Sequence, residues 1–275
     1  MSNDSMGQSV PISEEDFKAN VRRSHQEHFD HVFRLHSIAQ DAINTFGTQT
    51  TTPYQQAVAL IFPRAFKSFD SIRRLCEIAS CEDAAVVLRS LLNLMAVTRW
   101  ISLEPSVHAR KYLHWYWVQM HNDLQTLGGV IPSGYAPYIE KRYRRVKKQF
   151  EYTDGKGRKK QAKKWHQPEA SNIYDLFVQT GLKQQYEEGY RPLSGIEHSD
   201  ATAFFAMIRG AKVGEDEHRL NVQSDIFVPH YLRNAFQYFG DIFEICNRTI
   251  PLTDDAELQK VIAEGKAFYE ADMKA

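Results

Sequence analysis

One predicted helix, over residues 82–103, limits the possible folds more than any other feature of the sequence. Its apolar residues fall on every side of the helix instead of forming a single stripe. They are Ala85, Val86, Leu88, Leu91, Leu92, Leu94 and Met95. A helix that is apolar all round has to be covered by other elements on all sides. We therefore expect this helix at the centre of a helical bundle.

The rest of the chain shows the same three- and four-residue apolar spacing, which indicates helices throughout. The predicted helices cover residues 13–47, 53–78 with Pro63 inside, a stretch ending at Gly128, and then 173–180, 184–189, 193–209, 226–248 and about 253–271. No alternating run of β-branched residues indicates a strand. The sequence predicts an all-α, multi-helix bundle that forms one domain over residues 1–275, with residues 1–12 disordered.

The composition is that of a soluble globular protein, with 43% hydrophobic residues and 34 basic side chains against 34 acidic ones. Cys76, Cys81 and Cys246 are too few and too scattered for a disulfide framework or a zinc site. The N-terminus lacks the apolar core of a secretory signal, and apolar runs such as 57–62 are shorter than a membrane span. We expect a cytoplasmic protein without a membrane partner. No phosphate-binding or nucleophile motif predicts a cofactor, and we expect neither a cofactor nor a metal.

The basic residues are concentrated in one segment, 141–164. It holds twelve Lys and Arg and two acidic residues, so it carries a net charge of +10 and leaves −10 on the rest of this neutral chain. The Thr-Asp-Gly-Lys-Gly run at 153–157 indicates a turn or mobile loop, so we expect a basic helix-loop or hairpin that projects from the bundle. The predicted nucleic-acid-binding residues are Lys141, Arg142, Arg144, Arg145, Lys147, Lys148, Lys159, Lys160, Lys163 and Lys164.

Aromatic residues are interleaved with these cations at Tyr138, Tyr143, Phe150 and Tyr152. Cations bind a phosphate backbone and aromatic rings stack on bases, so the mixture favours RNA or another polyanion as a partner. The alternative is a solvated segment that contacts the acidic remainder of the same chain or a second copy in a homodimer.

A second group of polar residues lies between 186 and 200. Tyr186 and Tyr190 are one helical turn apart, and His198 follows Ser194 by four residues on the same predicted helix face. A serine hydroxyl one turn from an imidazole can hydrogen-bond to it. This pattern predicts either a polar or catalytic pocket or a buried network that fixes helix packing.

The order Tyr-x3-Tyr-x2-Leu-Ser-x3-His at 186–198 resembles the signature of a widespread bacterial helical family that is catalogued only as a domain of unknown function. The similarity extends over residues 84–200 and includes Arg-Ser-Leu-Leu-Asn at 89–93 and Lys-Lys-Trp at 163–165. The family usually has a glutamate where this chain has Asn93. The resemblance implies a helical fold more than a function, and Asn93 argues against a role at this position that needs a carboxylate, such as a metal ligand or a base for His198. The residues predicted to form the polar pocket are Arg89, Asn93, Tyr186, Tyr190 and Ser194. In that pocket Arg89 binds an anion, unless it pairs with an acid or reaches solvent.

Arg191 and His198 form an Arg-x6-His pattern, interrupted by Pro192, that is similar to the motif of HEPN-type helical RNases of toxin and phage-defence systems. This resemblance implies that His198 acts as a general acid or base and that Arg191 stabilises the phosphorane. Two functions therefore stay open. One is an RNA-associated, HEPN-like bacterial protein of defence or toxin systems, and the other is a non-catalytic helical module that self-associates.

Three histidines in the predicted first helix, His25, His28 and His31, follow one another in three-residue steps. Side chains of this type can bind a metal. They lie beside the apolar stripe of Phe29 and Phe33, however, so we predict a solvated helix face instead.

Overall fold

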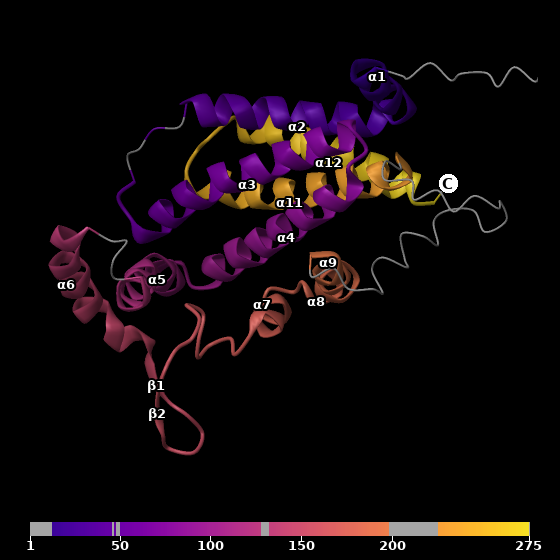
Figure 1. The fold of residues 1–275 in the computed structure, drawn as a ribbon. Helices are drawn as coiled ribbons and strands as arrows, with labels where there is room; N and C mark the ends of the chain where they lie inside the picture. The colour runs from indigo at the N-terminus through magenta and orange to yellow at the C-terminus, as the bar shows by residue number, and fades with distance from the viewer. Residues whose placement is uncertain (1–12, 46, 48–49, 128–131, 198–224, 275) are drawn as a thin grey trace, which may run out of the picture.

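The computed structural model describes residues 13–45, 47, 50–127, 132–197 and 225–274 (Figure 1). Its α-helices are α1 (Glu14–Ser24), α2 (Gln26–Thr45), α3 (Pro53–Glu77), α4 (Cys81–Leu103), α5 (Pro105–Thr126), α6 (Ala136–Val146), α7 (Ile173–Gln179), α8 (Lys183–Gln185), α9 (Arg191–Glu197), α11 (Val228–Thr249) and α12 (Asp255–Asp272). Short 3-10 helices are η1 (Ser133–Tyr135), η2 (Lys147–Phe150) and η4 (Asp225–Phe227), and η3 (Tyr186–Tyr190) is a π-helical turn. The two strands of the described residues are β1 (Glu151–Thr153) and β2 (Lys159–Gln161). The predicted all-α bundle is confirmed.

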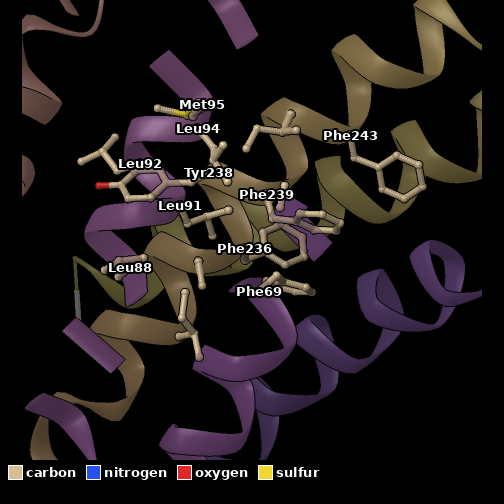
Figure 2. Packing of buried hydrophobic residues seen from close by; sticks show 14 of the residues in the cluster. Phe69, Leu88, Leu91, Leu92, Leu94, Met95, Phe236, Tyr238, Phe239 and Phe243 are labelled. Atoms are coloured by element: carbon tan, nitrogen blue, oxygen red, sulfur yellow. The ribbon is translucent and has the colours of Figure 1, made fainter. Parts of the chain in front are cut away.

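Helix α4 lies at the centre of the bundle, as its apolar surface predicts. It packs against α3 and α11 on one side and against α7, η3 and α9 on the other, while α2 and α12 form an outer layer over α3 and α11 (Figure 1). Leucines of α4 face the aromatic side chains of α11, which Figure 2 shows from close by. The Phe69 ring of α3 stacks on the Phe239 ring of α11 at 4.5 Å between centroids, so one continuous core joins these three helices.

Helix α4 is long and apolar enough to cross a membrane by length and composition, which the short apolar runs of the sequence did not suggest. The structure buries 67% of its most apolar window among other helices. This is the environment of a core helix.

The single helix predicted for residues 13–47 is instead two helices, with a break at His25 (φ −125°, ψ 33°). The break turns α1 toward α3, where the Arg22 guanidinium lies 2.9 Å from the Glu77 carboxylate. Glu77 also pairs with Arg73 one helical turn before it. This contact between distant residues has no counterpart in the local apolar spacing.

The prediction of a solvated histidine face was wrong. His28 Nε2 lies 3.2 Å from an Asp272 carboxylate oxygen, and the His31 ring stacks on Phe268 at 4.6 Å. These histidines therefore line the contact between α2 and α12, where the side chain of His28 is only 12% exposed.

The basic segment contains an antiparallel hairpin, although the sequence indicated no strand. Its turn is fixed by Asp154, whose carboxylate accepts hydrogen bonds from the backbone N–H groups of Lys156 and Arg158, both at 2.9 Å. Gly157 adopts φ +74°, a conformation that glycine reaches without strain. The predicted turn is confirmed, and the pairing of β1 with β2 follows from it.

The hairpin and α6 have a small core of their own at the far end of α5. Its buried residues are Val118, Val146, Phe150 and Ala162. The chain returns to the bundle through Trp165, whose ring lies edge-on to that of Trp100 at 5.0 Å. Lys111 then donates to the Gln167 carbonyl at 3.1 Å. As a result the basic hairpin projects from one end of the bundle (Figure 1).

Candidate functional site

The basic segment presents its charge to solvent. Of its twelve Lys and Arg side chains, eleven are exposed and Lys147 is partly buried. The Asp154 carboxylate pairs with Arg158 at 2.9 Å and with Lys160 at 3.1 Å. The hydrogen bond from the Arg158 backbone N–H, together with these two side chains, holds the pKa of Asp154 well below the usual range. The remaining pair joins Arg144 to Glu140 at a long 3.8 Å.

The other nine cations of the segment form no ion pair with any residue that the structure describes. They are Lys141, Arg142, Arg145, Lys147, Lys148, Lys156, Lys159, Lys163 and Lys164. Their like charges repel one another in the free protein. A polyanion that contacts them would remove this repulsion and release bound counterions.

The structure separates the aromatic residues that the sequence placed among these cations. Phe150 is fully buried in the small core, and the Tyr143 ring is stacked on His121 at 3.8 Å. Tyr152 packs against the same core. Tyr138 is 46% exposed, and among these four it is the one with a large accessible surface.

Two aromatic residues of α5, Tyr116 and Trp117, join Tyr138, and the sequence did not indicate them as part of the site. The Trp117 ring lies edge-to-face with Tyr138 at 5.5 Å and with Tyr116 at 5.0 Å. The Arg142 guanidinium lies 5.6 Å from the Trp117 ring and 5.1 Å from the Tyr138 ring. The run Trp115-Tyr116-Trp117 was the available signal, but it gives no indication that α6 returns along α5.

The opposite side of α6 borders an open pocket of about 640 Å³. Its lining residues are Ala136, Pro137, Glu140, Lys141 and Arg144. Cations therefore lie on both sides of this helix.

The second candidate site lies where η3 crosses α4. The Arg89 guanidinium lies 4.5 Å from the Tyr190 ring, and its Nη2 donates a hydrogen bond to the Tyr190 hydroxyl at 3.0 Å. Tyr190 is stacked on Tyr186 at 5.3 Å between centroids. The structure thus brings Arg89 together with both predicted tyrosines, although 101 positions separate Arg89 from Tyr190.

Two amide side chains belong to the same stretch of structure, Asn93 on α4 one turn after Arg89 and Gln185 directly before Tyr186. The Asn93 Oδ1 and Gln185 Oε1 atoms are buried and accept no hydrogen bond from any described residue. Buried acceptors without a donor are uncommon in folded proteins and cost free energy. Asn93 stands where the resembled family usually has glutamate, and an amide lowers the charge that this position has to bury.

The turn at η3 is wider than an α-helical turn, and Pro192 accounts for it. In a regular α-helix Pro192 would offer no N–H to the Glu188 carbonyl and its ring would collide with that carbonyl. In η3 the Arg191 N–H bonds to the Tyr186 carbonyl instead. Gly189 allows the close approach, because an added Cβ would lie 3.2 Å from both Leu92 Cδ2 and the Tyr238 hydroxyl. Burial raises the pKa of Tyr238 to about 12.

Of the predicted catalytic pair Arg191 and His198, the structure describes Arg191. Arg191 begins α9 with its side chain 74% exposed, and its Nη1 lies 3.3 Å from a Glu187 carboxylate oxygen. Ser194 is partly buried on the same helix. His198 lies outside the described residues, so its pairing with Ser194 or Arg191 stays a prediction.

Comparison with known proteins adds one finding. A family model described as a family of unknown function (DUF5677) matches residues 55–217, a range that includes the basic segment and the polar group at η3. The expected similarity to a family of unknown function is confirmed, and the match names no ribonuclease. No curated protein and no solved structure matches the chain.

Proposed function

We propose that this chain, which belongs to the DUF5677 family, binds RNA through the basic segment 141–164. The observation that carries the proposal is the set of exposed cations that no described acid neutralises. Each such side chain can replace a counterion on a phosphate, and releasing that ion favours binding. In this proposal the cations of the hairpin and α6 contact RNA phosphates, and they do not contact the acidic remainder of the same chain.

If charge drives binding, the Kd for RNA should depend steeply on the salt concentration. If six cations contact phosphates, the Kd rises on the order of 10³-fold between 50 and 200 mM salt. Fluorescence polarisation with a labelled RNA measures this directly. A Kd that does not change with salt would contradict the proposal.

Charge reversal tests the location. Changing Arg144, Arg145, Lys147 and Lys148 together to Glu is expected to raise the Kd at least 100-fold. A matched control changes four exposed cations of the bundle to Glu and alters the net charge equally. They are Arg23, Lys67, Arg248 and Lys260. An equal loss of binding in both variants would show that net charge, and not the segment, determines binding.

A ribonuclease of HEPN type is the second candidate, and it would suit a role in bacterial defence or toxin systems. The Arg-x6-His pattern together with the exposed Arg191 at the start of α9 favours it. Cleavage of labelled RNA by the wild type should then be lost in both Arg191→Ala and His198→Ala, with non-additive effects in the double variant. Absence of cleavage by the wild type on single-stranded and duplex RNA would exclude this candidate.

A non-catalytic module that self-associates is the remaining alternative. Its support is the opposite charge of the basic segment and the rest of the chain. In that case the quadruple Glu variant would change the oligomeric state in sedimentation, and RNA binding would be absent.

A further inference from the structure

We propose that the basic segment takes an unpaired strand of nucleic acid in preference to a duplex, and that its bases stack on Tyr138 and Tyr116. This inference rests on the proposed function and specifies its ligand. It follows from an aromatic surface formed by α5 and α6 together, which we call the Trp117 ring group. The group consists of Tyr116, Trp117 and Tyr138, with Arg142 against two of the rings.

The rings are both accessible and held in place. Tyr116 is 53% exposed and Tyr138 is 46% exposed, whereas Trp117 packs against the small core of the hairpin. Trp117 meets its two neighbours at interplanar angles of 75° and 81°. These edge-to-face contacts orient the tyrosine rings before a ligand arrives, so less side-chain freedom is lost on binding.

Cations accompany the rings along the same side of α6. Tyr138, Arg142 and Arg145 follow at i, i+4 and i+7, which places them in one row on the helix. Arg142 Nε donates to the Tyr138 hydroxyl at 3.2 Å, so this guanidinium is fixed beside the ring. Because a single strand carries one phosphate for each base, a ring followed by cations on the same helix face can contact both a base and the neighbouring phosphates.

A duplex can use the cations but not the rings. Its bases are already stacked inside the helix, and the deep major groove of duplex RNA does not admit side chains. The charge density of a duplex is also higher than that of a single strand, so cations alone would favour the duplex. A preference for single strands therefore reports base stacking, and not charge.

The test compares a 15-nucleotide oligouridine RNA with a 15-base-pair RNA duplex on the full chain. We expect a lower Kd for the single strand. Tyr138→Ala should raise that Kd at least 5-fold, the lower end of the roughly 5- to 150-fold typical of one base–aromatic stack, and should leave the duplex Kd unchanged. The matched control is Tyr138→Phe, which keeps the ring but removes the hydroxyl that holds Arg142; the Kd for the single strand should rise less than in Tyr138→Ala, and the preference for the single strand should persist. The exposure of Tyr138 makes both variants compatible with folding, which circular dichroism checks.

A second readout is the fluorescence of Trp117. Oligouridine should quench the tryptophan emission of the wild type, and Trp117→Phe should remove most of that quenching although three other tryptophans stay in the chain. Salt-sensitive binding with equal or lower Kd for the duplex, and no effect of Tyr138→Ala, would overturn this inference and leave the proposed function standing. Binding of neither ligand would overturn both.

Discussion

Replacing glycine by alanine should have opposite effects on stability at two helical positions, Gly240 in α11 and Gly265 in α12. A Cβ added to Gly265 of α12 would lie 2.2 Å from Cζ and 2.6 Å from Cε1 of Phe236, a ring that is fully buried. A Cβ added to Gly240 of α11 would meet Ile262 at 3.7 Å, which is an ordinary van der Waals contact. Gly240→Ala therefore fits the packing, whereas Gly265→Ala requires Phe236 or α12 to move by more than about 1 Å.

The magnitudes follow from two opposing effects. Replacing glycine by alanine inside a helix stabilises the folded state by about 0.5–1 kcal/mol. Gly240→Ala gains this amount, which raises the Tm by about 2 °C in a chain of this size. Gly265→Ala gains the same amount but overpacks the core at a cost of about 1–3 kcal/mol. We expect a net loss near 1–2 kcal/mol, which lowers the Tm by about 2–4 °C.

Thermal unfolding followed by circular dichroism or calorimetry measures both variants against the wild type. The double variant Gly265→Ala with Phe236→Leu provides the control, because leucine vacates the ring position that the new methyl group overlaps. Its loss of stability should be smaller than the sum of the two single losses. A Tm for Gly265→Ala equal to or above that of the wild type would refute the close packing of α12 on Phe236.

Two further predictions concern titratable groups in the bundle. Burial lowers the pKa of His31, His36 and His166. As the pH falls, the unfolded chain therefore binds protons before the folded protein does, and the Tm should drop below about pH 6.5. A Tm that stays constant from pH 7.5 to 5 would contradict this. Burial also raises the pKa of Cys81 to about 12 and those of the other two cysteines in the same direction, so a thiol reagent at pH 8 should label all three in denaturant and none in the folded protein. Labelling of the folded protein at the denatured rate would show that these thiols are accessible.

The sequence predicted the parts of the fold that depend on local patterns. Helix α4 could be placed at the centre because residues apolar on all sides have one stable environment in a bundle. The break at His25 could not be predicted, because the local apolar spacing continues across it and α1 makes its contact with α3, through Arg22 and Glu77, between residues more than fifty positions apart. The strands β1 and β2 were missed because each has three residues without apolar alternation. The Asp154 turn and the small core at Phe150 and Ala162 bring them together.

The candidate site divides in the same way. Charge can be counted along a sequence, so the basic segment was found from its Lys and Arg residues. The aromatic partners were not, because Trp117 and Tyr138 come from different helices and meet only after α6 packs on α5. Arg89 and Tyr190 were both predicted as pocket residues, but their contact was not, because its geometry depends on the π-helical turn that Pro192 imposes.

The separation of charge gives the molecule a direction of approach. The chain as a whole is neutral, so the field of a distant polyanion exerts no net force on its total charge. The same field pulls on the basic segment and pushes on the acidic remainder, and this rotates the molecule. The hairpin stands away from the bundle (Figure 1), and at physiological salt the field of each charge decays over about 8 Å. Encounters in which the hairpin leads are therefore favoured, while those in which the acidic bundle leads are turned away. For the RNA binding that we propose, the projecting position of the basic segment would thus select the orientation of approach before any specific contact forms.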